Sequence, residues 1–518
     1  MQKYSNNEVV DAVVIGTGAG GAPILSRLAR AGLKVVALEA GKYWDAKNDF
    51  ATDEYEQSKI FWNYERLSAG DDPLAFGRNN SGIGVGGSTL GYTAYTPRPQ
   101  PDDFKIRSDF GVGRDWPLSY EDLEPYYDEL ESFLGVSGPS PYPWGPPQKS
   151  KYPLTPLPLN AAAQLMERGC KQMNLKTAPA PNAILSAPYF QPFVGWRNAC
   201  NNRGFCQAGC NTGAKASMDV TFIPVAIHFG AEIRTESFAT VLEKNTQGKI
   251  TAVVYKNDGV EKKQLCKYLF LCAGAIETPR ILLMNELSNS SGEVGKNFMA
   301  NVGVQVWGEF SELTHPYKGI PASLICEEMH RPHADFASGY FLQSIGVMPI
   351  TYASQLTRAT GTWGKELRKR MEAYNHVAGI NMHGECLPHE NNFLELSDEP
   401  DQMGLPKPRI HFTLGENEKK IASHGENLMK EIWSAAGAQN MFVYNRNSHT
   451  IGTCVMGNNG EDSVVNAEGR SFDIPNLYIC DNSIFPSSMN ANPALTIMAL
   501  ALRTADLFLG KMKSNSLN

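Results

Sequence analysis

The chain has 518 residues, of which 42% are hydrophobic and 19% charged, and its net charge is −7. This composition excludes a fully disordered, fibrous or collagen-like chain, and the mildly acidic balance argues against sequence-independent binding to DNA or RNA. At roughly 150 residues per domain the length suggests about two to four domains. The 47 glycines need an explanation, because glycine is favoured where the backbone turns sharply or approaches a ligand closely.

Targeting and disulfide signals are weak throughout the chain. No run of about 18 apolar residues occurs, so no transmembrane helix is expected. Residues 1–10 are polar, without the pattern of a signal peptide, and no twin-Arg pair is present. We therefore expect no export signal of its own, which leaves the cytoplasm, or export alongside a signal-bearing partner, as its compartment. Ten cysteines are too sparse for a disulfide scaffold.

The N-terminal segment predicts a complete βαβ unit. Residues 11–15 are typical of a buried parallel strand, and Gly16-Thr-Gly18-Ala-Gly-Gly21 after them matches G-x-G-x-x-G. Residues 22–31 have helical character, and 34–38 form a second predicted strand that ends at Glu39. The strand before the glycines and the helix after them favour a dinucleotide site over a Gly-rich loop of some other α/β protein.

Each residue of this motif has a physical task at such a site. Gly16 permits the tight turn, Gly18 lets the backbone approach a pyrophosphate, and Gly21 lets the helix pack on the strand. The helix N-terminus stabilises the phosphate charge. Glu39 is placed to accept hydrogen bonds from ribose hydroxyls, which favours FAD or NAD over a cofactor with a 2′-phosphate.

Two later segments favour FAD over NAD. Gly82-Ile-Gly84-Val-Gly86-Gly87-Ser88-Thr89 offers a second close backbone approach, as the long body of a flavin requires. Near the C-terminus, residues 476–480 predict a strand ending at Asp481, and residues 492–496 open an apolar helix that runs to about 509. The N-terminus of that helix is suited to face the flavin pyrimidine ring, where negative charge develops on reduction.

The middle of the chain carries weaker signals. Residues 115–134 predict an acidic amphipathic helix and 139–158 a Pro-rich surface loop. Between about 300 and 440 we expect strands at 302–310, 340–348 and 393–396 and helices at 366–372 and 416–435. Candidate substrate contacts there, each more often an ordinary surface residue, are His383, Glu385, His389 and Asn391.

Three of the cysteines form a local cluster, Cys200, Cys206 and Cys210, with the spacing C-x5-C-x3-C. Three thiolates so close in sequence are suited to a metal or an iron–sulfur cluster, although they are one ligand short of a closed zinc site. The alternative is a loop of free thiols, or one disulfide with a spare cysteine.

Five segments of the chain follow one another in a characteristic order. They are Leu38-Glu39-Ala40-Gly41, Val85-Gly-Gly-Ser-Thr89, Leu271-Cys-Ala-Gly274-Ala-Ile-Glu-Thr278-Pro279, His449-Thr-Ile-Gly452-Thr453-Cys-Val-Met456-Gly457 and Asp481 with Asn492-Pro493. In this order they resemble the motifs of the glucose–methanol–choline (GMC) family of FAD oxidoreductases. The chain departs from the family pattern at Gly91-Tyr92 and at Met284-Asn285, which affects the substrate-side flavin contacts but not the fold.

The resemblance implies an α/β fold, α+β overall. A Rossmann-like FAD-binding domain would comprise residues 1–155, 195–300 and 440–518, with the Cys-rich loop at 197–217. An interleaved substrate-binding domain, built on an antiparallel sheet with helices, would comprise 156–194 and 301–439.

The resemblance also implies the site residues. His449 takes the place of the catalytic base, and Asn492 that of a second active-site residue whose amide donates to the substrate oxygen. Asn492 has an alternative reading as a helix N-cap before Pro493, and Asn490 is its nearest competitor. The implied FAD contacts are Gly16, Gly18, Ala19, Gly20, Gly21, Glu39, Ala40, Gly86, Gly87, Ser88, Thr89, Ala273, Gly274, Asp481, Asn492, Pro493 and Thr496.

Within the family, the large subunits of bacterial FAD-dependent glucose, fructose and gluconate dehydrogenases carry a similar three-Cys segment that holds a [3Fe–4S] cluster. Long-chain alcohol oxidases have Cys-rich versions too. This resemblance implies oxidation of a sugar, polyol or sugar-acid hydroxyl by hydride transfer to flavin N5. Electrons would leave through Cys200, Cys206 and Cys210 to a cytochrome or other acceptor, beside a small signal-bearing subunit. The alternatives are an oxidase that makes hydrogen peroxide and a non-catalytic flavoprotein subunit.

Overall fold

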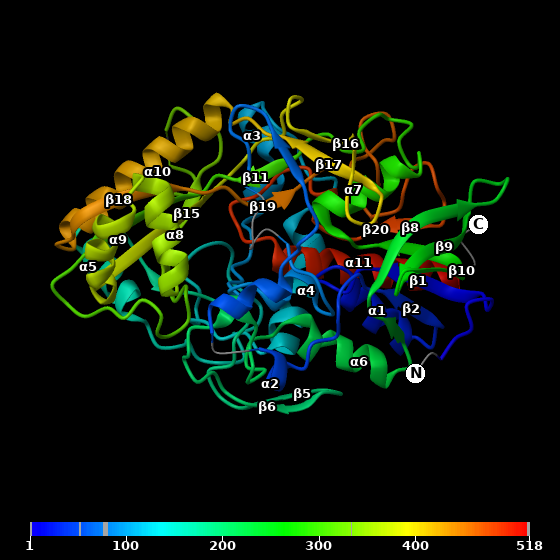
Figure 1. Cartoon of the computed structure of the whole chain (residues 1–518), viewed down its shortest axis with the longest axis horizontal. Coiled ribbons are helices and arrows are strands. Elements are labelled where there is room, and N and C mark those ends of the chain that lie inside the picture. Colours follow the sequence, from blue (N-terminus) through cyan, green and yellow to red (C-terminus); the bar gives the residue numbers. More distant parts are fainter. Residues whose placement is uncertain (1–2, 51–52, 76–80, 333, 515–518) are drawn as a thin grey trace.

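The computed structural model describes residues 3–50, 53–75, 81–332 and 334–514, and it contains two main sheets (Figure 1). The first is seven-stranded, in the order β7-β2-β1-β10-β9-β8, with β20 also paired to β10. Its strands are β1 (Val10–Ile15), β2 (Val35–Leu38), β7 (Glu232–Arg234), β8 (Ser237–Lys244), β9 (Ile250–Asn257), β10 (Val260–Leu271) and β20 (Leu477–Ile479).

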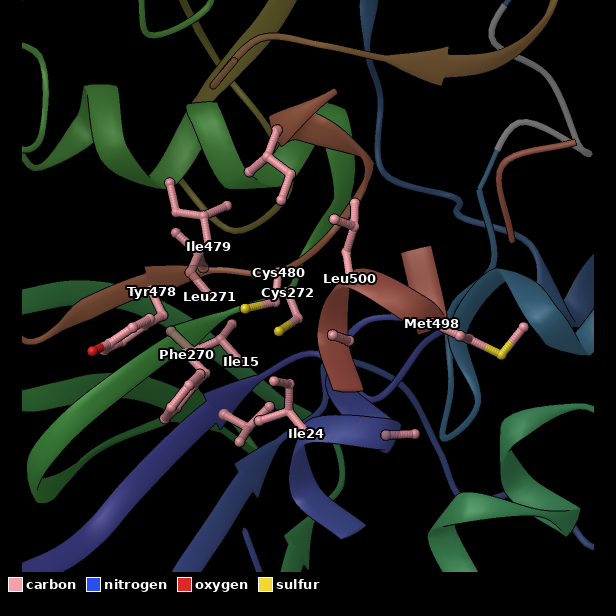
Figure 2. Packing of buried hydrophobic residues seen from close by; sticks show 14 of the residues in the cluster. Ile15, Ile24, Phe270, Leu271, Cys272, Tyr478, Ile479, Cys480, Met498 and Leu500 are labelled. Carbon is pink, nitrogen blue, oxygen red and sulfur yellow. The ribbon is translucent and has the colours of Figure 1, made fainter. Parts of the chain in front are cut away.

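The N-terminal βαβ prediction is confirmed by β1, helix α1 (Gly21–Arg30) and β2, which pairs with β1 in parallel. Helix α11 (Ala494–Lys513) packs beside α1. Figure 2 shows Ile24 of α1, Phe270 of β10 and Leu500 of α11 as members of one buried hydrophobic cluster. The parallel strands are continuously apolar because helices cover the sheet, so side chains on both faces are buried. No described helix is long and apolar enough to cross a membrane.

The second sheet is antiparallel and six-stranded, in the order β18-β12-β15-β14-β13-β4. Helices α5 (Ala161–Gln172) and α10 (Glu416–Ala435) cover one face, where Trp433 donates to the carbonyl of Val306 at 2.8 Å. Its strands are β4 (Ala178–Pro179), β12 (Val304–Glu309), β13 (Leu324–Cys326), β14 (Tyr340–Ile345), β15 (Val377–Gly384) and β18 (Gln439–Asn445).

Shorter elements join the two sheets. Their helices are α2 (Ala46–Asp49), α3 (Ile106–Phe110), α4 (Tyr120–Leu134), α6 (Phe222–His228), α7 (Gly274–Met284), α8 (Pro349–Thr360) and α9 (Gly364–Glu372). Their strands are β3 (Leu67–Ala69), β5 (Tyr189–Gln191), β6 (Gly195–Arg197), β11 (Met299–Asn301), β16 (Phe393–Pro400), β17 (Pro406–His411) and β19 (Ser448–Ile451).

The structure differs from the predicted elements in several places, including the three that follow. The helix expected from 115 begins at Tyr120, because Ser119 forms a capping box with Asp122 and ends the extended segment before it. Helix α8 was not predicted. Strand β18 pairs with β12, so residues 440–445, assigned from the sequence to the FAD-binding domain, lie in the second sheet.

A matched pair of glycine substitutions tests the packing of α5 on α10. A Cβ at Gly169 would lie 2.2 Å from the carbonyl oxygen of Ile432, whereas one at Gly510 in α11 meets nothing within 4 Å. We expect Gly169→Ala to destabilise the fold by about 1–3 kcal/mol and Gly510→Ala to stabilise it by about 0.5–1 kcal/mol, measured by thermal unfolding. Equal melting temperatures for the two variants would contradict this packing.

Candidate active site

A cavity of about 1160 Å³ is lined by residues of both sheets. Most of the residues predicted from the sequence meet in its wall, from the first glycine loop at one end to His449 at the other. Those that line it are Gly16, Gly18, Ala19, Gly20, Glu39, Ala40, Gly87, Ser88, Thr89, Ala273, Gly274, His449, Asp481, Asn492 and Pro493.

Gly21, Gly86 and Thr496 do not line the cavity, and packing within the protein accounts for each. A Cβ at Gly21 would lie 1.9 Å from the Gly16 carbonyl oxygen. Gly86 has a φ of 111°, in the left-handed region that favours glycine. The Thr496 hydroxyl is buried, 3.2 Å from the hydroxyl of Tyr127. Roles for these three at a cofactor therefore stay predictions.

Glu39 joins the two glycine-rich segments. Its carboxylate accepts from the amide and hydroxyl of Thr17, at 3.1 and 2.7 Å, and from the amides of Gly41 and Gly84, at 3.0 and 3.2 Å. Burial raises its pKa, while these donors act in the opposite direction. Four donors match the approximate acceptor capacity of a carboxylate. Glu39 thus holds the shape of the cavity end, and a contact to ribose remains a prediction.

His449 is oriented by two asparagines that flank its ring. Asn301 Oδ1 lies 3.1 Å from Nδ1, and Asn492 Nδ2 lies 3.3 Å from Nε2. The amide nitrogen of Asn301 donates to the carbonyls of Gly384 and Met489 and to the hydroxyl of Ser488, so its oxygen is the end that faces His449. Nδ1 therefore carries the proton, and Nε2 presents a lone pair.

The imidazole of His449 is held uncharged. Burial, and then the charge of Arg446, lower its pKa to about 4. The ring of His383 stacks on it with centroids 4.9 Å apart, and burial lowers the pKa of His383 well below its ordinary value. Two neutral imidazoles therefore share this end of the cavity, and His449 is available as a proton acceptor at neutral pH.

The side chain of Asn492 does not cap α11, whose N-cap residue is Pro493. Asn492 Oδ1 is buried and has no hydrogen-bond partner among the described residues. A buried orphaned oxygen beside a cavity is unfavourable unless a ligand satisfies it. Asn490, the competing candidate, donates instead to Ser338 and to the carbonyl of His330, away from the cavity wall.

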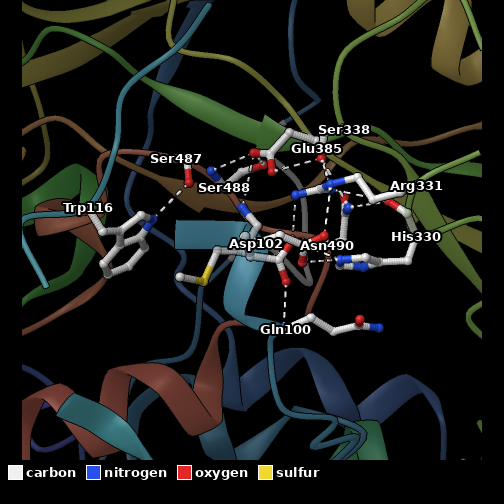
Figure 3. Close-up of polar contacts among 12 residues, drawn as sticks. Gln100, Asp102, Trp116, His330, Arg331, Ser338, Glu385, Ser487, Ser488 and Asn490 are labelled. Carbon is white, nitrogen blue, oxygen red and sulfur yellow. Dashed lines mark hydrogen bonds and ion pairs between the residues drawn. The ribbon is translucent and has the colours of Figure 1, made fainter. Parts of the chain in front are cut away.

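A buried network fixes the segment that leads to Asn492 (Figure 3). The Glu385 carboxylate accepts from the amide and hydroxyl of Ser488 and from the amide of Met489, at 2.9 to 3.0 Å. Burial, with the charge of Asp103, raises the pKa of Glu385 to about 7. Glu385 thus positions a loop and does not itself line the cavity.

The other two candidate contacts from this region also lie off the cavity wall. His389 pairs with Glu418 at 2.9 Å, and Asn391 is exposed. His383 is the one of the four that lines the cavity.

A row of polar side chains on the second sheet was missed from the sequence. Tyr444, Gln305, Asn381 and Gln343 stand at directly paired positions on β18, β12, β15 and β14, and all four line the cavity. Alternation of apolar and polar residues within β12 and β15 is the signal that could have found them. Their three amides and one phenol suit a substrate with several hydroxyls.

The cysteine loop lies against the wall of the cavity. Cys200, Cys206 and Cys210 do not line it, but Gln207 does. The buried ammonium of Lys215 donates to the carbonyls of Cys206, Leu90 and Tyr92, at 2.6 to 3.0 Å, which joins the loop to the segment after the second glycine-rich stretch.

The three thiols are not gathered as a zinc site requires. Sulfurs on one zinc ion lie within about 4 Å of one another. Among the His, Cys, Asp and Glu residues of the described part of the chain, the only three whose ligand atoms lie within 4.8 Å of one another are Asp102, Asp103 and His330. At that place Arg331 already pairs with Asp102 at 3.2 Å.

Comparisons with known proteins show which family and which fold this chain is similar to. The GMC oxidoreductase family profile matches residues 75–302 and 388–501. The chain is 29% identical to the fructose dehydrogenase large subunit of Gluconobacter japonicus, over 97% of this chain and 98% of that one. It is 32% identical to the 2-methyl-1,2-propanediol dehydrogenase of Mycolicibacterium austroafricanum, over 96% and 94%. A formate oxidase of Aspergillus oryzae, at 14% identity, shares the fold with a TM-score of 0.72 over 99% of this chain and 100% of that one.

The four hydrogen bonds that the Glu39 carboxylate accepts, called here the Glu39 clamp, generate a prediction. Glu39→Gln puts a donor where backbone amides need an acceptor, so we expect FAD affinity to fall about tenfold or more, with a lower melting temperature. The exposed Glu366→Gln on α9 is the control with the same charge change and should keep wild-type affinity. Fluorimetric titration of the apoprotein with FAD measures it, and unchanged affinity in Glu39→Gln would contradict the clamp.

Proposed function

The chain belongs to the GMC oxidoreductase family, whose members act on CH–OH groups with FAD, and we propose that it oxidises a hydroxyl of a sugar, polyol or sugar acid to a carbonyl. The observation that carries this proposal is the neutral His449, with the lone pair of Nε2 beside Asn492 in a cavity with a polar wall. Such a nitrogen can accept the proton of a substrate hydroxyl.

The first glycine loop suits FAD. A Cβ at Gly18 would meet nothing closer than 3.6 Å, so protein packing does not require glycine there. A bare backbone at the N-terminus of α1 is what a pyrophosphate needs. Ser88, Gly274 and Pro493 border the rest of the same cavity and are proposed as further contacts. When bound, FAD supplies the acceptor for the hydride from the carbinol carbon.

His449 and Asn492 have different tasks at the substrate hydroxyl: His449 accepts its proton, and Asn492 donates a hydrogen bond to its oxygen. Asn301 keeps the proton of His449 on Nδ1, so Nε2 receives the hydroxyl proton as the carbonyl forms. A substrate oxygen placed between Nε2 and Asn492 would replace their present 3.3 Å contact and accept from the Asn492 amide. That donor stabilises alkoxide character on the oxygen.

We further propose that Cys200, Cys206 and Cys210 hold a [3Fe–4S] cluster as the electron exit. Supporting this are two buried cations beside the thiols, Arg197 and Lys215, whose hydrogen bonds go to carbonyl or amide oxygens and not to carboxylates. The buried carboxylate of Asp219 acts on both cations, which leaves one positive charge in excess, and thiolate ligands would offset it. A one-electron centre favours a dehydrogenase over an oxidase.

An electron exit implies a partner. We propose a cytochrome or similar acceptor and a small signal-bearing subunit, with the complex in the periplasm. This partner is proposed because the sequence contains no C-x-x-C-H haem motif of its own.

Replacing the proposed base tests the function. His449→Ala should slow anaerobic flavin reduction by about 10²- to 10⁴-fold while FAD stays bound, because general-base catalysis is lost. In the wild type, the rate should hold from pH 7 to pH 5 and fall only as pH drops through about 4, where His449 becomes protonated. Stopped-flow bleaching of the flavin with a panel of sugars and polyols measures both.

His389→Ala is the matched control, because His389 pairs with Glu418 outside the cavity. It should keep the wild-type rate. Wild-type reduction in His449→Ala would remove His449 as the base. Failure of every alcohol to bleach the wild-type flavin would instead favour a non-catalytic subunit.

Metal analysis tests the electron exit. Anaerobically purified protein should contain iron and labile sulfide, which Cys206→Ser should lose and Cys266→Ala, a buried thiol on β10 outside the loop, should keep. Absence of iron and sulfide from the wild type would reject the cluster. Stoichiometric peroxide in air would then support the oxidase alternative.

A further inference from the structure

Five basic side chains line the cavity, and two of them have no carboxylate partner. Arg66 pairs with Glu277 at 3.0 Å, and Lys419 pairs with Glu416 at 3.1 Å. Arg280 also pairs with carboxylates, those of Glu277 and Asp401. Arg358 and Arg446 make no ion pair and no side-chain hydrogen bond within the described part of the chain.

Arg446 lies beside the reactive histidines. It directly follows β18, two residues after Tyr444 of the polar row, so its side chain continues along the same face of the sheet. Its amide donates to the carbonyl of Gly303 at 2.8 Å, and Gly303 stands across from His383 in the extension of the β12–β15 register. A Cβ at Gly303 would lie 1.7 Å from the carbonyl oxygen of Arg446, so the backbones of these two residues pack directly against each other.

The acidic groups of the cavity near this end are already engaged. Glu54 accepts from the first amides of α8, and Glu426 pairs with Lys430. Burial lowers the pKa of Arg446, Arg358 acts in the same direction, and the phenol of Tyr444 is the one group that opposes them. The guanidinium of Arg446 lines the cavity without a carboxylate partner among the described residues, and a guanidinium binds carboxylates well. The anion that completes this site is not supplied by the described residues.

Building on the proposed function, we propose that Arg446 binds the carboxylate of an anionic substrate, so that the enzyme oxidises a hydroxy acid. A guanidinium takes a carboxylate through two parallel hydrogen bonds, which fixes its orientation as well as its position. Arg358, exposed on α8 at the same cavity, attracts the anion towards it.

The carboxylate of the substrate is unchanged in the reaction, and the atoms and electrons balance without it. The carbinol hydrogen leaves with its electron pair for the flavin, the hydroxyl proton goes to His449 Nε2, and the C–O bond becomes a carbonyl. Arg446 is therefore a specificity-determining residue, and its removal should weaken the binding of acids and leave the binding of neutral alcohols unchanged.

Matched substrate pairs test this inference. Glycolate, lactate, glycerate and gluconate are each compared with the alcohol that has CH2OH in place of the carboxylate: ethylene glycol, propane-1,2-diol, glycerol and glucitol. Anaerobic flavin reduction by the holoenzyme should have a higher kcat/KM for at least one acid than for its partner. In Arg446→Gln that acid should show a KM about 10- to 100-fold higher, while the KM of the neutral partner stays within twofold.

Further variants separate a carboxylate contact from other effects. Arg446→Lys keeps the charge and should retain part of the preference, whereas Arg107→Gln, an exposed arginine on α3 outside the cavity, should retain all of it. The flavin reduction potential should be equal in wild type and Arg446→Gln.

Two results overturn the inference while the proposed function stands. In the first, the polyols reduce the wild-type flavin at rates equal to those of the acids. In the second, Arg446→Gln loses the same factor of rate with the acid and with the polyol. A flavin that no acid and no polyol reduces would overturn the proposed function, and this inference with it.

Discussion

The active site depends on one constraint, which is that the imidazole of His449 stays neutral with Nε2 as its unprotonated nitrogen. The hydrogen bonds of Asn301 meet this constraint. Its side chain contacts the end of β15 at Gly384, the C-terminal loop at Met489 and the imidazole itself. The second sheet, the loop before α11 and the proposed base are thereby fixed in one arrangement. A change at any of the three would disturb the tautomer and not only the position of the ring.

The backbone around His449 is shaped for the same purpose. His449 has a φ of 56° and Met489 a φ of 60°, in the left-handed region that costs a non-glycine residue about 1–3 kcal/mol. The pairing of β11 with β19 shifts register between Ala300 and Asn301, directly beside the contact to His449. Bulges of this kind re-aim side chains next to active sites. Packing of the two sheets offsets the strain.

Local patterns were sufficient to predict one half of the site. The strand, glycine loop and helix at 10–30 follow from periodicity and from the steric needs of glycine, which act over a few residues. The Asn301 contact joins residues 148 apart in the sequence, and no local pattern contains it. The polar row from Tyr444 to Gln343 needs the register of four strands, and the charge of Arg446 in the sequence does not reveal that it lacks a partner.

Arg446 and His449 together make the chemistry responsive to substrate. The positive charge of Arg446 is one cause of the lowered pKa of His449, after burial. A carboxylate bound to Arg446 would offset that charge, and the pKa of His449 would then rise towards its ordinary value. A general base is most effective when its pKa lies near the working pH. On the proposal made for Arg446, the imidazole is therefore a weak base in the empty cavity and a stronger one when an anionic substrate is in place, which favours proton transfer from that substrate over transfer from water.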